Sequence, residues 1–168
     1  MTLVKNLNYQ KIFFVIFILL LTVVYQSFFS ELFKLNGVKF DLPILLIVYL
    51  AILRGPKEGA LFGFSIGLLL DIFNPHFLGL GALIKCFIGF FVGNFKETLF
   101  LESIFSKVVI LFLAVFTNDL FYILISSGFG FQRTFEVLWY GSLLSGLYTC
   151  FWGFFLFVFP KKISIRLT

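Results

Sequence analysis

The sequence has 168 residues, of which 61% are hydrophobic and 12% are charged, and its mean hydropathy is +1.09. A soluble domain carries roughly 25% charged residues, so this composition excludes a surface that faces water on all sides and favours an integral membrane protein. The basic residues that give the net charge of +5 form no cluster in the sequence, which excludes a nucleic-acid-binding surface. Two cysteines and one histidine are too few for a disulfide framework or a metal site, and no cofactor is expected.

Six apolar segments are expected to form membrane-spanning helices, because a span needs about 20 apolar residues, with a range of about 17 to 25. The first segment is too long for a signal-peptide core, and no small-residue cleavage site follows it. In the second segment, Asp41 and Pro43 suit the first turn of a helix. The expected spans are residues 12–29, 40–53, 58–73, 77–95, 104–126 and 135–159.

The connections between these segments leave no room for a soluble domain, so residues 1–168 are expected to form a single all-α, polytopic membrane helical bundle. The second and third segments are short, which makes five complete spans the alternative to six. Basic residues favour the cytoplasmic side, and their distribution supports six spans with both termini in the cytoplasm. With the N-terminus inside, the inner segments contain Lys5, Lys11, Arg54, Lys57, Lys96, Lys107, Lys161, Lys162 and Arg166, and the outer segments contain Lys34, Lys39 and Arg133.

Three ionisable residues, Asp71, Lys85 and Asp119, lie inside the expected spans. Each costs roughly 3 kcal/mol at the bilayer centre, so such residues usually face the bundle interior. At about 1.5 Å of rise per residue, Lys85 and Asp119 both lie roughly 10 to 12 Å below the outer boundary, with Asp71 somewhat above them. A buried cluster of the three would bind a ligand, an ion or a polar group of a partner, or would only fix helix packing. A catalytic pair of carboxylates, Asp71 with Asp119, is a further alternative, although no flanking motif supports it.

Glycines recur every four residues in two of the expected spans. Gly59, Gly63 and Gly67 form one stripe in the third span, and Gly89 and Gly93 repeat the pattern in the fourth. Small residues at this spacing let the backbones of two helices approach closely. The pattern predicts either packing within this chain or a groove that docks a transmembrane helix of another protein.

A tight turn is expected between the second and third spans, at Arg54-Gly55-Pro56-Lys57-Glu58. Gly55 and Pro56 are residues that set turns, and Glu58 lies in the first turn of the next helix, where a negative charge is favourable. The mixed charge of this segment predicts an anchor on the cytoplasmic side of the membrane.

The run from Asp41 to Gly93 resembles the MreD family of rod shape-determining proteins. That family shows an acid-and-proline region that opens an apolar helix, an Arg-Gly turn, a helix with the pattern E-G-A-x-x-G-F-x-x-G-L-x-x-D, a short turn and a G-L-x-A-L helix. The matching residues here are Arg54, Gly55, Glu58, Gly59, Gly63, Gly67, Asp71, Gly79, Leu80, Ala82 and Leu83. The resemblance covers about a third of the chain, and it assigns no role to Lys85 or Asp119.

This resemblance implies a protein of the bacterial cytoplasmic (inner) membrane that is not an enzyme. MreD-like proteins belong to the cell-elongation machinery, with MreC, the actin-like MreB, RodA and a class B penicillin-binding protein. Their fold looks similar to that of the substrate-binding subunits of energy-coupling-factor vitamin transporters. If that similarity holds, the polar cluster corresponds to the outer cavity where those subunits hold a ligand, and here the cavity is expected to hold a segment of MreC.

Two functions of different classes follow. The first is a non-catalytic membrane scaffold of the rod complex that binds MreC and supports lateral peptidoglycan synthesis and cell shape. The alternative is a small-molecule, vitamin-type binding subunit of a membrane transporter, which predicts a compact pocket lined by aromatic residues.

Overall fold

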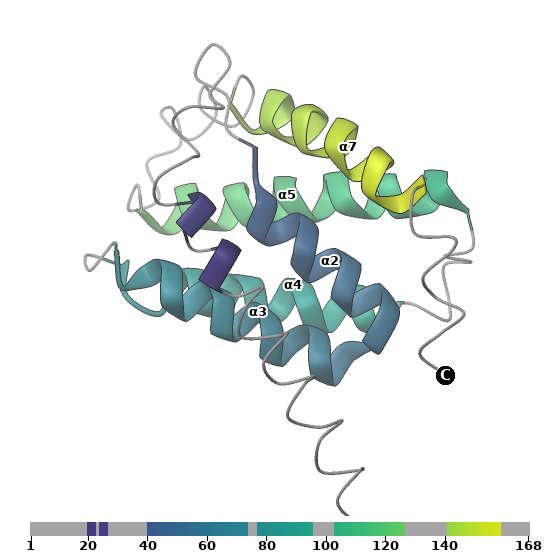
Figure 1. Ribbon diagram of the computed structural model, residues 1–168. Coiled ribbons are helices and arrows are strands. Elements are labelled where there is room, and N and C mark those ends of the chain that lie inside the picture. Colours follow the sequence, from purple (N-terminus) through teal and green to yellow (C-terminus); the bar gives the residue numbers. More distant parts are fainter. Residues whose placement is uncertain are drawn as a thin grey trace, which may run out of the picture.

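A computed structural model describes residues 20–22, 24–26, 40–73, 77–95, 103–126 and 141–158. These residues are almost entirely helical, and no strand occurs among them (Figure 1). Most of the expected span 12–29, residues 135–140 and 159 of the last expected span, and residues 74–76 between the third and fourth expected spans lie outside the described residues. The helices are α2 (Leu42–Arg54), α3 (Pro56–Asp71), α4 (Leu80–Asn94), α5 (Ile104–Ser126) and α7 (Leu143–Val158).

The start and end of α2 follow from local chemistry. The Asp41 carboxylate accepts a hydrogen bond from the backbone N–H of Ile44 at 3.0 Å, which caps the first turn, and Pro43 lies within that turn. This helix start is the one that the sequence predicts. The helix ends at Gly55, whose φ of 95° and ψ of −173° place it in a region that is essentially restricted to glycine. Since α3 begins at the next residue, Gly55 alone joins the two helices.

Helices α3 and α4 form an antiparallel hairpin in which the backbones are in close contact. Gly59 lies against Gly89, and Gly63 lies against the backbone of Lys85. Near the end of α3, Gly67 lies against the backbone of Ala82. Because each step forward along α3 is matched by a step backward along α4, the two glycine stripes lie against the facing helix over most of the hairpin.

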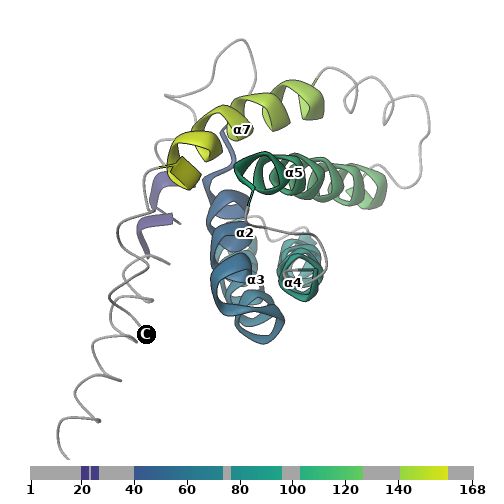
Figure 2. The same ribbon diagram turned by 90° about the vertical axis from the view of Figure 1, so that its right-hand side faces the viewer.

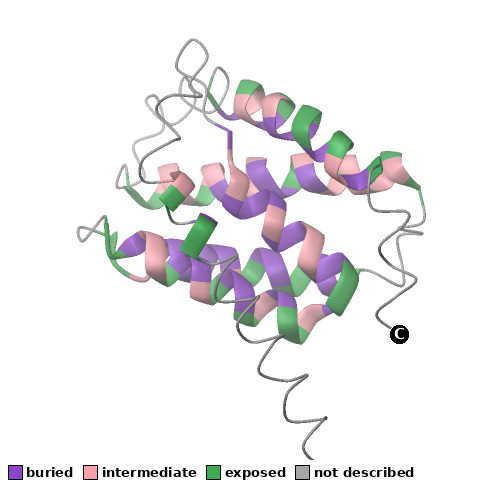
Figure 3. Cartoon of the chain, in the orientation of Figure 1, coloured by how far each residue is buried: buried purple, intermediate pink, exposed green. Residues whose placement is uncertain are grey.

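Helix α2 occupies the centre of the described bundle, where it contacts α3, α4, α5 and α7. Figure 2 shows the α3–α4 pair and the α5–α7 pair with α2 between them. Its inward side chains are fully buried and join residues of α4 and α5 in one hydrophobic core (Figure 3). This core includes Ile44, Leu45, Val48, Ala51, Ile84, Ile88, Leu111 and Val115.

The outer faces of the helices carry large apolar side chains. Leu61, Phe87, Phe105 and Phe151 are 68%, 60%, 77% and 60% exposed, respectively. Apolar surface on several sides of a bundle is stable in lipid rather than in water. The surface of the described helices therefore agrees with the composition in indicating a membrane environment.

Among the described helices, α5 is long and apolar enough to cross a membrane. Its 23 residues correspond to about 34 Å at 1.5 Å per residue, compared with a hydrocarbon thickness of about 30 Å. Helices α2, α4 and α7 are also apolar but have 13, 15 and 16 residues. One such crossing helix is shown, and the six-span arrangement stays a prediction.

Candidate functional site

Asp71 caps the N-terminus of α4. Its Oδ2 atom accepts hydrogen bonds from the backbone N–H groups of Gly79 at 2.9 Å and Ala82 at 3.0 Å. The N-cap residue of α4 is Gly79, which has no side chain to perform this function. Asp71 is 6% exposed, and its carboxylate also lies so close to Gly81 that a side chain at Gly81 would meet it. Asp71 therefore connects the end of α3 to the start of α4.

The Arg-Gly turn is held by backbone conformation and by a surface ion pair. Arg54 and Glu58 form a salt bridge at 3.0 Å between side chains that are 44% and 58% exposed. Gly93, near the end of α4, packs against the backbone of Gly55 and Pro56. The turn is thus a packing surface for α4 as well as a connection between two helices.

The glycine stripes of α3 and α4 pack against other helices of the same chain. A Cβ atom at Gly59 would lie 2.6 Å from the Gly89 carbonyl oxygen and 2.7 Å from the Ala51 side chain. Neither distance is compatible with a real side chain, so glycine is required at Gly59 by its own neighbours. The second reading of the stripes, a groove for a partner helix, is not needed to explain these residues.

A polar cluster lies where α2, α4 and α5 converge. The carboxylate of Asp119, on α5, accepts hydrogen bonds from the Asn118 side chain at 3.1 Å and from the Ser142 hydroxyl. Asp119 also interacts electrostatically with Lys85 of α4 and with Asp41 at the start of α2. We call Asp41, Lys85 and Asp119 the interior cluster.

Lys85 is the positive charge of this interior cluster. It is 9% exposed, and it attracts the carboxylates of both Asp41 and Asp119. The two carboxylates repel each other, and the attraction of each carboxylate to Lys85 offsets that repulsion. Burying charges is costly unless they are compensated, and each member of this cluster has at least one partner of opposite charge in range.

The interior cluster is also attached to α7. The backbone N–H of Asp41 donates a hydrogen bond to the Thr149 hydroxyl at 3.2 Å, across 108 residues of sequence. Thr149 is completely buried, and Ser142 is 2% exposed. Thr149 of α7 and Ser142, which directly precedes α7, thus complete the surroundings of Asp41 and Asp119.

The structure brings together two of the three ionisable residues that the sequence singles out, Lys85 and Asp119. Asp71 makes different contacts, with the backbone of α4. Sequence reasoning identified Asp41 as a helix start but not as a member of the cluster. The position of Asp41 offered a signal, because Asp41 opens the second expected span near the outer boundary from which the depths of Lys85 and Asp119 are counted.

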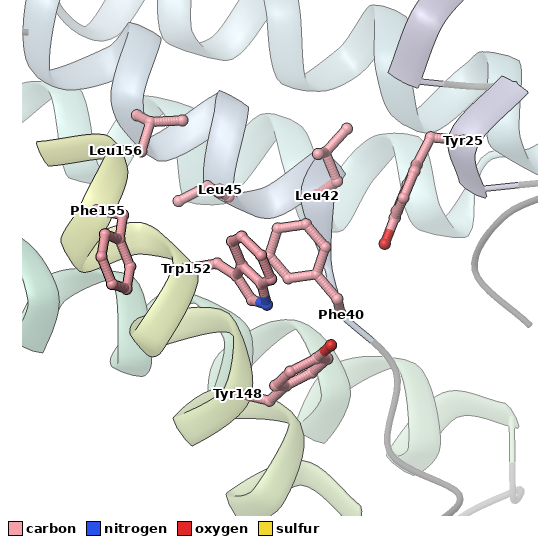
Figure 4. A pocket seen from close by; sticks show the side chains of 8 residues that line it. All are labelled: Tyr25, Phe40, Leu42, Leu45, Tyr148, Trp152, Phe155 and Leu156. Carbon is pink, nitrogen blue, oxygen red and sulfur yellow. The ribbon is translucent and has the colours of Figure 1, made fainter. Parts of the chain in front are cut away.

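A cavity of about 470 Å³ lies between α2, α7 and residues 24–26 (Figure 4). Its walls are almost wholly apolar, and five of the eight lining residues are aromatic. These five are Tyr25, Phe40, Tyr148, Trp152 and Phe155. Phe40 is edge-on to both Tyr25 and Tyr148, with ring centroids 5.8 and 6.1 Å apart.

Asp71 and Asp119 have different partners in the structure. Asp119 is held by an amide and a hydroxyl, and among the described residues no group of three or more His, Cys, Asp or Glu side chains could hold a metal ion. The pair Asp71 and Asp119, considered from sequence as a catalytic dyad, is divided between the helix cap and the interior cluster. Both carboxylates have structural hydrogen bonds in these positions.

Comparison with known proteins identifies the family. No curated protein and no solved structure matches the chain, and the expected similarity to transporter substrate-binding subunits therefore stays a prediction. The family model described as rod shape-determining protein MreD matches residues 8–163 of the 168. This match extends far beyond the run from Asp41 to Gly93 that carries the resemblance in the sequence. The chain belongs to the MreD family of rod shape-determining membrane proteins.

Proposed function

We propose that the chain is a non-catalytic scaffold of the rod complex that binds MreC in the bacterial cytoplasmic membrane. Membership of the MreD family supports a role in determining rod shape. Beyond this role, the proposal names MreC as the partner, scaffolding as the mode of action and the interior cluster as the site. Lateral peptidoglycan synthesis would depend on the scaffold because the synthetic proteins act where the complex holds them.

The interior cluster is the observation that carries this proposal. Asp41, Lys85 and Asp119 come from three different helices and meet inside an apolar bundle. Ionisable residues within membrane proteins are expensive and mark functional sites by default. A purely structural need at this point would be met at lower cost by apolar residues.

Lys85 is the member best placed to recognise a partner. Both carboxylates accept hydrogen bonds from groups next to them, from Ile44 N–H in one case and from Asn118 in the other. The Lys85 ammonium makes longer-range electrostatic contacts with them, and it carries three N–H donors. A backbone carbonyl or polar side chain of an MreC segment would complete its hydrogen bonding.

The test is recovery of MreC with the tagged chain from mildly solubilised membranes. The wild-type chain and Lys57→Gln are expected to recover MreC equally, because Lys57 is an exposed residue in the first turn of α3. Lys85→Gln is expected to bind MreC at least about tenfold more weakly and to recover correspondingly less of it, because loss of a hydrogen bond to a charged group costs about 1.5 to 3 kcal/mol and each 1.4 kcal/mol is a factor of about ten. Failure of the wild type to recover MreC, while other elongation proteins stay together, would contradict the proposal.

The same proposal includes six spans with both termini in the cytoplasm. Cysteines introduced near residues 5 and 165, in a chain lacking Cys86 and Cys150, are expected to be protected from a membrane-impermeant thiol reagent in intact cells. Labelling of either terminus would favour an odd number of spans.

A second function is favoured by one observation, the aromatic-lined cavity between α2 and α7. A vitamin-type binding subunit predicts a compact pocket of this kind. Recovery of a water-soluble small molecule with the purified protein, released on unfolding, would support this alternative. Absence of MreC from the same preparation would strengthen it further.

A further inference from the structure

Lys85 lies inside the interior cluster without a direct hydrogen bond. It is 9% exposed, and among the described residues its ammonium group forms no hydrogen bond and no ion pair. Its interactions with Asp41 and Asp119 are electrostatic and act over a longer range. An ammonium group has three N–H donors and no acceptor. Lys85 thus has hydrogen-bonding capacity that the described helices leave unused.

The two carboxylates of the interior cluster can accept further hydrogen bonds. A carboxylate has two oxygens with about four acceptor positions. Among the described residues, Asp41 accepts from the backbone N–H of Ile44. Asp119 accepts from the Asn118 amide and from the Ser142 hydroxyl. A group that completes the cluster must therefore accept a hydrogen bond from the ammonium and donate one to a carboxylate.

The charges of the interior cluster select the kind of group that can do so. A negative group would be repelled by two carboxylates, and a positive group would be repelled by the Lys85 ammonium. A neutral group avoids both repulsions, and it costs less to transfer into an apolar bundle than an ion does. The side-chain amide of Asn or Gln carries an acceptor oxygen and a nitrogen with two donors on neighbouring atoms.

An amide also has the reach that the cluster requires. Because Lys85 forms no ion pair among the described residues, the bridging group must span more than a direct contact. An amide forms one hydrogen bond of about 2.9 Å at each end, which spans such a separation. A hydroxyl group uses one oxygen for both roles and reaches less far. The Asn118 amide donates to Asp119 at 3.1 Å, so an amide is already a partner of this carboxylate.

The interior cluster is partly accessible to another chain. Asp41 and Asp119 are only partly buried, and the Lys85 ammonium nitrogen is not completely enclosed. Helices α4 and α5 also carry exposed apolar side chains, among them Leu83 and Phe121. Apolar helices associate in membranes through hydrogen bonds of Asn and Gln as well as through packing. A partner suited to this site is therefore an apolar membrane segment with an amide side chain.

We propose that an Asn or Gln side chain on an apolar membrane segment of MreC binds the interior cluster. The carbonyl oxygen of this amide accepts a hydrogen bond from Lys85, and its NH₂ group donates to one of the two carboxylates. The inference rests on the proposed function for the identity of the partner, and it adds the residue type through which the partner is recognised.

The test uses synthetic helices as probes and needs no MreC. Each probe is an apolar helix of about 20 leucine and alanine residues, with Asn, Leu, Asp or Arg as its central guest residue. Binding to the full chain in phospholipid vesicles is measured by energy transfer, at dilutions where each probe is monomeric. The Asn probe is expected to bind about three- to thirtyfold more tightly than the Leu probe. The Asp and Arg probes are expected to bind no more tightly than the Leu probe.

Two variants locate the preference for the Asn probe. Lys85→Met removes the ammonium group and keeps an apolar stem, so it is expected to bind the Asn and Leu probes equally. Lys57→Gln, at an exposed residue of α3, is expected to keep the wild-type preference. A folded Lys85→Met that also keeps this preference overturns the proposal.

The wild-type comparison decides the matter even if Lys85→Met fails to fold. The proposal is overturned if the wild type binds the Asn probe no more tightly than the Leu probe, or if it prefers the Asp or Arg probe. A wild type that prefers the Asn probe but recovers no MreC supports recognition of an amide and contradicts the proposed function. A wild type that recovers MreC without preferring the Asn probe contradicts only the present inference.

Discussion

The Asp71 carboxylate accepts a hydrogen bond from the backbone N–H of Ala82, 11 residues further along the chain, at 3.0 Å. The first N–H groups of a helix have no partners within that helix, and Gly79 at the N-cap has no side chain that could accept from them. Asp71 supplies both the missing acceptor and a negative charge at the positive end of the helix dipole. One carboxylate thereby ends α3, begins α4 and fixes the hairpin between them.

Replacing Asp71 is expected to destabilise the hairpin. Asp71→Ala leaves two N–H groups without an acceptor, which costs about 1 to 3 kcal/mol, and Asp71→Asn should recover part of that loss through its amide oxygen. Thermal unfolding in detergent measures the effect. Glu58→Gln breaks only an exposed ion pair, which is worth about 0 to 1 kcal/mol. Equal melting temperatures for Asp71→Ala and Glu58→Gln would contradict the capping role.

Adding a methyl group between α3 and α4 is expected to push the helices apart. Gly63 lies against the backbone of Lys85, which cannot move aside as a flexible side chain would. Gly63→Ala is therefore expected to cost about 1 to 3 kcal/mol, the usual range for overpacking. Ser65→Ala, on the same helix, removes a hydroxyl that bonds the Leu61 carbonyl at 2.8 Å and serves as the control. Equal melting temperatures for Gly63→Ala and Ser65→Ala would show that the contact between Gly63 and the Lys85 backbone is loose.

Gly55 offers a test of backbone strain without any steric clash. No atom lies within 4 Å of a Cβ built at Gly55, so the cost of Gly55→Ala comes from its backbone conformation alone. That cost is expected to be about 1 to 3 kcal/mol. Arg54→Gln, at the adjacent residue, loses only the surface salt bridge and should change stability by less than about 1 kcal/mol. Chemical or thermal unfolding that ranks Arg54→Gln as the more harmful change would be inconsistent with this account of the turn.

The hydrogen bond between Asp41 and Thr149 is expected to stabilise the packing of α7 on α2. Thr149→Val keeps the shape of the side chain but removes the acceptor for the Asp41 N–H, at a cost of about 1 to 3 kcal/mol. Thr149→Ser keeps the hydroxyl and should lose less. Hydrogen exchange at the Asp41 amide, measured with the two variants in parallel, would report the bond directly. Unchanged protection in Thr149→Val would show that another group accepts from this amide.

The sequence predicts those structural features that depend on residues within about one helical turn of each other. Asp41 and Pro43 mark a helix start because capping involves residues within one turn of each other. The spacing of Gly59 and Gly63 shows a smooth helix face because the helical repeat is fixed. The spacing alone did not show whether that face met α4 or another protein. That answer depends on the hairpin geometry, which brings Gly89 opposite Gly59.

Features that require three helices to meet were less accessible. Lys85 and Asp119 could be paired from their expected depths, because depth follows from position along a span. The third member is Asp41, which approaches them only because α2 lies between the other helices. Asp71 was grouped with them by depth, but the nearby N-terminus of α4 supplies its hydrogen bonds. The residues that line the aromatic cavity between α2 and α7 could not be identified from sequence, because they come from segments far apart in the chain.

The central claim is that the interior cluster serves rod shape through contact with a partner. The most direct measurement is cell width and length in a rod-shaped bacterium depleted of its own MreD and expressing this chain at matched membrane levels. The wild type and Lys57→Gln are expected to restore rods, whereas Lys85→Gln and Asp119→Asn, though folded and inserted, are expected to leave the cells rounded. Full restoration of rods by both cluster variants would contradict the claim.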